Sequence, residues 1–245
     1  MPKKNRKLYS SRSQYHKKSI EDCVTTIAIS DFWTNLSTSL TEILDGSNLS
    51  LILCYGLGNF MDSLQSRYQL ALLLVIKKEF NVDNCLVYDP KFTDAEQVHL
   101  AEIGCDLISE NEEGKRRLLP GTFVYMPHCP KQLLNNLLWA NWNKDVLINS
   151  VVLCNSIDLT VTSTPDRILD KYAHYVLKIA PFAKEKQLSK HFVYEDIFND
   201  MSLHYFPKDK LEESNNIYWE RGREPVYDDE ELEFITKFEC LSFQN

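Results

Sequence analysis

The sequence contains no apolar run that approaches the roughly 20 residues of a membrane-spanning helix. Its N-terminus lacks the apolar segment of a secretory signal peptide, and its seven cysteines show no paired or C-x-x-C spacing. These absences argue against a membrane protein, a secreted protein and a disulfide-stabilised protein. We therefore expect a cytoplasmic protein with free thiols and no membrane partner, with the nucleus open as a second compartment.

Acidic residues are also absent from the first 20 positions, which carry seven lysines and arginines. The net charge of the whole chain is −8, so the other 225 residues sum to about −15. An acidic body binds nucleic acid poorly, because non-specific binding depends on basic contacts with phosphates. We expect residues 1–19 to be a disordered basic leader and the only part of the chain suited to touch nucleic acid or to serve as a nuclear address.

Acidic residues gather at the other end of the chain. Residues 211–245 hold ten acids and three bases, including the run DDEELE at 228–233, so we expect 209–245 to be a mobile acidic tail. Internal repeats and low-complexity tracts are lacking, and 245 residues with 44% hydrophobic composition suffice for one substantial core. The sequence thus predicts a single domain over residues 20–208.

Between the charged ends, short apolar runs alternate with helical stretches. Residues 20–44 have the spacing of one or two amphipathic helices and are followed by a glycine stop signal. Runs that are apolar at nearly every position predict buried strands at 49–55, 85–89, 105–109, 121–126, 150–156 and 173–180. Helices are predicted at 62–79, 93–103 and 131–139. This alternation requires parallel pairing, so we expect an α/β fold: a Rossmann-like, doubly wound, mostly parallel sheet with an N-terminal helical extension.

Polar residues follow the predicted strands, at the sheet edge where open parallel sheets bind ligands. In the first loop, CYGLGNF, Gly56 and Gly58 could let the backbone approach a phosphate or a ribose. Met61 stands where a dinucleotide fingerprint requires a small residue. A looser turn that holds S-adenosylmethionine fits better, with Asp89 after the second strand binding the ribose hydroxyls. A plain tight turn without a ligand is the alternative.

His128 and Cys129 follow the fourth predicted strand and lie between Pro127 and Pro130, which restrict the backbone. The imidazole and the thiol could act as base and nucleophile, or as metal ligands. No Cys/His spacing supplies further ligands, so no metal site is predicted. Cys129-Pro130 also has the form of a haem-responsive motif in which a thiolate ligates ferric haem. The simplest alternative is a rigid turn with a hydrogen-bonded histidine.

The block SENEEGK (109–115) has two interpretations. Glu110 and Asn111 could bind the exocyclic amine and the ring edge of adenine. Alternatively, Ser109 is the N-cap of a helix and Glu112 has the capping-box spacing. The two interpretations are compatible with each other.

Several blocks resemble the "sensitivity to red light reduced" family, the SRR-like proteins. They are GLGNF (56–60), RYQLALLL (67–74), VYDPKFT (87–93), SENEEGKR (109–116), YMPHCPKQLLNNLLWANW (125–142) and CNS (154–156). The resemblance runs from about residue 51 to about residue 207. It implies a role in circadian clock input, cytoskeletal phenotypes or haem biosynthesis, and it leaves open whether the protein is an enzyme.

Three function classes follow. The first is a regulator of the circadian and haem-linked kind whose Rossmann-like pocket binds a small molecule, such as an adenosine-type cofactor. The second is an S-adenosylmethionine-dependent methyltransferase that uses His128 or Asp158 near the acceptor. The third is an interaction protein without a ligand, which binds protein partners through its acidic tail.

Overall fold

The computed structural model describes residues 18–227, 235 and 236. The predicted basic leader, apart from residues 18 and 19, and the acidic run at 228–233 lie outside the described residues. None of the helices in the described part of the chain has the length and apolar composition needed to cross a membrane.

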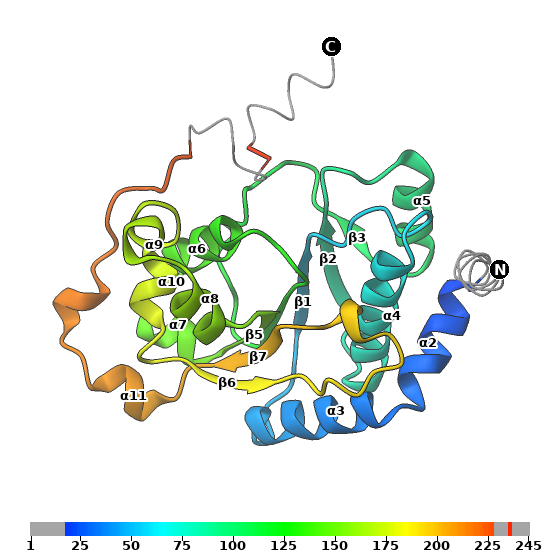
Figure 1. The fold of residues 1–245 in the computed structure, drawn as a ribbon, viewed down its shortest axis with the longest axis horizontal. Coiled ribbons are helices and arrows are strands. Elements are labelled where there is room, and N and C mark those ends of the chain that lie inside the picture. The colour runs from blue at the N-terminus through cyan, green and yellow to red at the C-terminus, as the bar shows by residue number, and fades with distance from the viewer. Residues whose placement is uncertain (1–17, 228–234, 237–245) are drawn as a thin grey trace, which may run out of the picture.

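One seven-stranded sheet forms the centre of the described chain (Figure 1). Its strands are β1 (Leu51–Tyr55), β2 (Asn84–Tyr88), β3 (Asp106–Leu107), β4 (Thr122–Met126), β5 (Ser150–Asn155), β6 (Lys184–Gln187) and β7 (Met201–Tyr205). The spatial order is β3-β2-β1-β4-β5-β7-β6. The first five strands pair in parallel, and β7 is antiparallel to both β5 and β6. The prediction of a Rossmann-like, mostly parallel sheet is confirmed.

Helices cover both faces of the sheet. One face carries α2 (Ile20–Ala28), α3 (Asp31–Leu44), α4 (Leu64–Glu79) and α5 (Asp94–Glu102). The other carries α6 (Lys131–Ala140), α7 (Lys144–Ile148), α8 (Ile157–Ser163), α9 (Asp166–Tyr172), α10 (His174–Ile179) and α11 (Lys208–Glu212). Because side chains alternate along a strand, Ile52 and Cys54 enter the first core and Leu53 and Tyr55 the second. Both faces of β1 are therefore buried, which explains its continuous apolar sequence.

The N-terminal extension is confirmed as two helices. Ser30 separates them: its side chain accepts a hydrogen bond from the backbone N–H of Trp33 and so caps α3. The predicted capping box at Ser109 is wrong, because residues 110–117 form a turn and an irregular segment without a helix.

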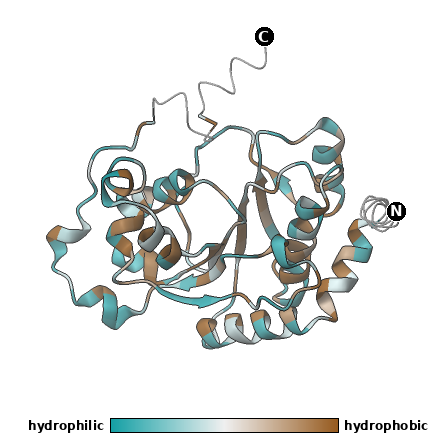
Figure 2. Cartoon of the chain, viewed as in Figure 1, coloured by the Kyte–Doolittle hydropathy of each residue, from teal (hydrophilic) through white to brown (hydrophobic). Residues whose placement is uncertain are grey.

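The predicted strand at 173–180 is also wrong, because this segment is helix α10. Its buried residues, Tyr175, Val176 and Ile179, lie on one helical face and pack in the second core. The two strands that complete the sheet, β6 and β7, were not predicted. The sequence of β6 is KEKQ, the strand is an outer one, and Figure 2 shows it as hydrophilic. An outer strand with exposed polar side chains has no hydrophobic pattern to reveal it.

Part of the predicted tail is packed against the body. Leu211 in α11 is fully buried and Trp219, in the short 3₁₀ helix η2 (Asn216–Trp219), is 9% exposed. Both belong to the second core. The compact body therefore extends beyond residue 208, the predicted end of the domain.

Candidate functional site

A cleft of about 690 Å³ lies outside the carboxyl ends of β1, β2 and β4. The chain passes from β1 to β2 and β3 on one side, and then returns to place β4 on the other side of β1. This is the switch point in strand order, where adjacent loops leave the sheet in opposite directions and open a crevice. Six of the predicted site residues line the cleft: Gly56, Gly58, Asp89, Asn111, His128 and Cys129. Glu110 does not line it and is exposed.

Asp89 connects the first two loops. Its Oδ2 accepts a hydrogen bond from the backbone N–H of Gly58 at 2.7 Å, and its Oδ1 accepts one from the N–H of Lys91 at 2.8 Å. Burial raises the pKa of this carboxyl, and the two backbone bonds act in the opposite direction without cancelling the effect. A carboxylate has about four acceptor sites, so these bonds leave acceptor capacity for a ligand in the cleft.

The two glycines have different roles, although both have positive φ angles, +78° at Gly56 and +66° at Gly58. A Cβ on Gly56 would lie 2.3 Å from Sγ of Cys129, so this glycine makes room for the thiol. A Cβ on Gly58 would lie 2.8 Å from Oγ of Ser66, which faces the cleft. Gly58 therefore keeps that wall of the cleft open.

Glu96 supports the glycine loop from outside the cleft and was not predicted. It is fully buried, and its Oε1 accepts a hydrogen bond from the backbone N–H of Met61 at 2.9 Å. Its Oε2 accepts bonds from Asn59 Nδ2 at 3.2 Å and from the backbone N–H of Thr93 at 2.9 Å. The last bond completes a capping box at the start of α5. The sequence TDAE (93–96) carries this capping signal, but it does not show that the same carboxylate also reaches the first loop.

His128 and Cys129 lie in the cleft, and their side chains have different hydrogen-bond partners. His128 has φ of +50°, in the left-handed region, and its Nε2 lies 2.9 Å from the carbonyl oxygen of Ile197. The Cys129 thiol donates to the carbonyl oxygen of Tyr55 at 3.3 Å. Burial raises the pKa of this thiol well above its ordinary value, which disfavours the thiolate needed for nucleophilic attack or haem ligation. Of the two, His128 is the better placed to act on a ligand.

Asn111 lies in the cleft wall with its amide already engaged. Its Oδ1 accepts from the backbone N–H of Glu113 at 3.0 Å, and its Nδ2 donates to the carbonyl oxygen of Ile235 at 3.0 Å. Ile235 lines the cleft as well, so a residue of the C-terminal segment contributes to the wall. Glu112, predicted as a capping residue, instead pairs with Arg116 at 2.6 Å.

The polar residues of the cleft that were missed include Ser66 and Gln69 on α4. Only 8% of Ser66 and 3% of Gln69 is exposed, and both line the cleft. Other polar residues, such as Gln65 and Arg67, stand beside them in the sequence, so nothing distinguished them from ordinary polar positions on a helix.

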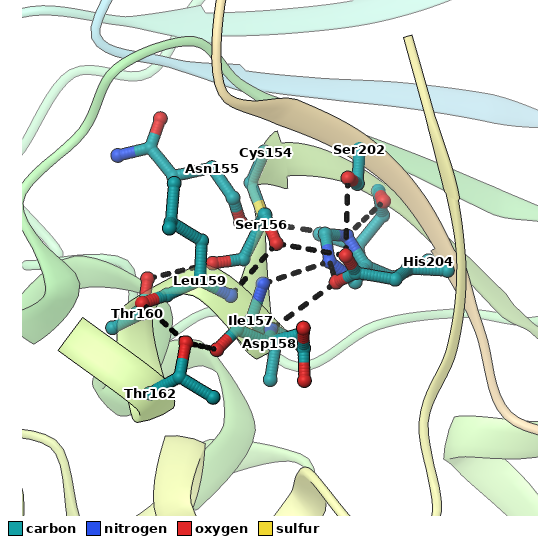
Figure 3. Close-up of polar contacts among 12 residues, drawn as sticks. Cys154, Asn155, Ser156, Ile157, Asp158, Leu159, Thr160, Thr162, Ser202 and His204 are labelled. Carbon is teal, nitrogen blue, oxygen red and sulfur yellow. Dashed lines mark hydrogen bonds and ion pairs between the residues drawn. The ribbon is translucent and has the colours of Figure 1, made fainter.

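The loop after β5 does not contribute Asp158 to the first cleft. Asp158 lines a second cleft of about 560 Å³ and does not line the first. Figure 3 shows Ser156 of this loop near His204 of β7. Glu185 completes a cluster with them: His204 Nε2 lies 3.0 Å from Glu185 Oε2, and the Ser156 hydroxyl donates to Glu185 Oε1 at 2.7 Å. The cluster joins β5, β6 and β7. Neither this cluster nor any other part of the described chain brings together three His, Cys, Asp or Glu residues able to hold a metal ion.

The sequence is similar to proteins of one family. The model of the SRR1 domain matches residues 36–205. An SRR1-like protein of Drosophila melanogaster is 29% identical over 216 residues, which cover 87% of this chain and 76% of the relative. The Arabidopsis thaliana protein SENSITIVITY TO RED LIGHT REDUCED 1 is 30% identical over 210 residues, which cover 78% of this chain and 74% of the relative. An SRR1-like protein of Mus musculus is 40% identical over 130 residues, 52% of each chain.

The comparison with solved structures gives distant matches. The methyltransferase PaMTH1 of Podospora anserina, solved with bound SAH, is 12% identical, with a TM-score of 0.41 over 84% of this chain and 98% of that one. LepI, solved in complex with SAM, is 11% identical, with a TM-score of 0.36 over 76% of this chain and 55% of LepI. The family is established by the sequence matches alone, since the SRR1 model spans most of the described chain. This chain belongs to the SRR1 domain family.

Proposed function

We propose that this protein is a regulatory protein whose cleft at the β1–β4 switch point binds an adenosine-type compound. The observation that carries the proposal is the position of Asp89, a half-buried carboxylate at the end of the strand beside β1, joined to the glycine loop by the Gly58 N–H at 2.7 Å. A carboxylate in this place accepts hydrogen bonds from two vicinal hydroxyls, the arrangement that a ribose presents.

The size and lining of the cleft support a ligand of this kind. A volume of about 690 Å³ is in the range of pockets that bury a drug-sized molecule. Tyr55, Leu57 and Leu133 supply apolar wall next to the polar groups. An adenosine needs such a combination, because the flat faces of its base pack against apolar side chains while its ribose carries hydroxyls.

A methyltransferase is the second candidate. The left-handed backbone of His128 supports it, because strained backbone conformations gather at active sites, and the imidazole lines the cleft proposed to hold the cofactor. In that reaction His128 would remove a proton from the acceptor as the methyl group is transferred.

The biological setting is inferred from the family. One relative is named for sensitivity to red light, in agreement with a regulatory role in light and clock input. The placement in haem biosynthesis and in the cytoplasm, and the contribution of protein partners, stay predictions that follow from the family resemblance and the composition.

Ligand-induced stabilisation tests the proposal. S-adenosylhomocysteine, S-adenosylmethionine, NAD and ATP are each titrated by calorimetry and thermal shift. We expect an adenosine compound to stabilise the protein saturably, by about 2.7 kcal/mol at a hundredfold excess over Kd. Gly58→Leu fills the cleft and should abolish the effect. Gly46→Leu is the matched control, because Gly46 also has a positive φ but a Cβ at this residue would meet no atom within 4 Å.

The outcome separates the function classes. If the ligand still stabilises Gly46→Leu but no longer stabilises Gly58→Leu, the result supports ligand binding in the cleft. If none of the four compounds stabilises the wild-type protein, the proposal fails and the interaction protein without a ligand is favoured.

A further inference from the structure

The wall of the cleft formed by α4 contains two buried polar side chains without hydrogen bonds. Ser66 and Gln69 are 8% and 3% exposed, and both line the cleft. Within the described chain, neither the Ser66 hydroxyl nor the Gln69 amide is hydrogen bonded to another residue. The other polar side chains discussed above are engaged: Asp89 by two backbone N–H groups, Asn111 by Glu113 and Ile235, and His128 by Ile197.

Among the described residues, neither side chain is one of those whose fully enclosed polar atoms lack a partner, so both groups are open to solvent in the cleft. A ligand that fills the cleft displaces this solvent and must replace its hydrogen bonds. Native proteins leave few polar side chains without a hydrogen bond, and a ligand can supply the partner for a polar side chain that opens onto a cleft. Ser66 and Gln69 are three residues apart on one helix, so their side chains face the same part of the cleft.

The helix that carries them favours a negative charge. α4 has 16 residues, and its first turn contains no acid, whereas α2, α3 and α5 each have at least one. The positive end of the α4 dipole is thus not complemented by its own side chains. Gln69 lies one turn further along, and helical side chains lean toward the N-terminus, so its amide covers the turn that contains Ser66.

Gly58 keeps this corner accessible, because a Cβ at this residue would lie 2.8 Å from Ser66 Oγ. The geometry points to a subsite that binds an anionic group, a carboxylate or a phosphate, through the Ser66 hydroxyl and the Gln69 amide. The inference rests on the proposed function: Asp89 binds the ribose of an adenosine-type ligand, and Ser66 and Gln69 bind the negative group attached to it.

Three compounds that contain adenosine show which anionic group, if any, the subsite binds. S-adenosylhomocysteine carries a carboxylate, AMP carries a phosphate, and 5′-methylthioadenosine carries neither. Calorimetry on the full chain should show that at least one of the charged compounds binds roughly ten- to a hundredfold more tightly than 5′-methylthioadenosine, the ratio expected of hydrogen bonds to a charged group. The preferred charged compound identifies the group.

Two variants assign the preference to the subsite. Gln69→Leu and Ser66→Ala should each lower the affinity for the preferred charged compound about tenfold while leaving that for 5′-methylthioadenosine unchanged. Gln132→Leu on α6 is the matched control: Gln132 is 4% exposed but does not line the cleft.

The failures are distinguishable. If all three compounds bind equally well, or if both variants weaken all three equally, the anionic subsite is refuted while the adenosine cleft stands. If none of the three binds the wild-type protein, the proposed function fails and the subsite with it.

Discussion

At the scale of single residues, the pair formed by His204 and Glu185 makes stability depend on pH. Burial lowers the pKa of His204, but contacts with Cys154 and Glu185 outweigh burial and raise it to about 10. Burial raises the pKa of Glu185, but hydrogen bonds from His204 and Ser156 outweigh it and lower this pKa to about 2. His204 is completely buried, so its positive charge depends on the Glu185 carboxylate.

The directions of these two pKa shifts determine the pH range in which the pair stabilises the fold. The ordinary pKa of His is 6.5, so its contribution is complete below that pH and is lost as the pH rises through about 10. The ordinary pKa of Glu is 4.5, so its contribution is complete above that pH and is lost as the pH falls through about 2. The pair therefore stabilises the fold most between about pH 4.5 and 6.5.

Glu185→Gln removes the negative partner and leaves the buried imidazole alone. We expect the free energy of unfolding to fall by about 3 kcal/mol at pH 6, and by less at pH 10, where His204 is half neutral in the wild type. Urea unfolding at pH 6, 8 and 10 measures this difference. Asp170→Asn is the control, because Asp170 pairs with His174 at 2.9 Å in an exposed position. A difference between wild type and Glu185→Gln that does not change with pH would refute the charged pair.

At the scale of elements, Glu96 couples helix α5 to the glycine loop. Glu96→Ala removes the capping box and leaves the Met61 N–H and the Asn59 amide with fewer partners. We expect a loss of about 2–3 kcal/mol in unfolding free energy, because a cap and a buried acceptor are lost together. We also expect weaker binding of S-adenosylhomocysteine, since the loop that holds Gly58 is loosened.

Urea unfolding and calorimetry on the same samples check both effects. Glu102→Ala is the control on the same helix, since Glu102 is exposed and does not touch the loop. If Glu96→Ala behaves like Glu102→Ala in both measurements, Glu96 does not support the loop.

Local sequence predicted the elements of the sheet where burial on both faces left a clear signal. Residues 51–55 and 122–126 are apolar at nearly every position and form the central strands β1 and β4. The strand KEKQ at 184–187 could not be predicted, because its pairing depends on β7, 14 or more residues further along the chain. Residues 174–179 were assigned to a strand because a short apolar run is ambiguous; their packing on α6 and α9 favours a helix.

The candidate site also contains residues that the sequence could predict and residues that it could not. Gly58, Asp89 and His128 could be predicted because they follow strands, and parallel pairing brings the ends of strands to one edge. The reach of Glu96 to Met61, and the unpaired amide of Gln69, depend on how helices rotate against the sheet. Periodicity along the chain does not determine that rotation at the level of a single side chain.

At the scale of the whole molecule, the segment after η2 fastens the end of the described chain to α6. Tyr227 donates a hydrogen bond to Asn136 Oδ1 at 3.1 Å and accepts one from Asn135 Nδ2 at 2.8 Å. Tyr227→Phe leaves these two buried amides short of a partner, so we expect a loss of about 1–2 kcal/mol. We also expect faster tryptic cleavage at Arg221 and Arg223.

Urea unfolding and timed proteolysis check this prediction. Tyr205→Phe is the control, since Tyr205 is half-buried and its hydroxyl has no hydrogen bond with a described residue. Equal cleavage rates in wild type and Tyr227→Phe would show that the hydroxyl does not hold the segment.

Hydrogen exchange with and without S-adenosylhomocysteine tests whether loops far apart in sequence form one ligand site at the switch point. We expect slower exchange in peptides covering 56–70, 88–92 and 127–130, with no change at 187–202 beside the second cleft. Protection confined to 187–202, or no protection at saturating ligand, would contradict this expectation.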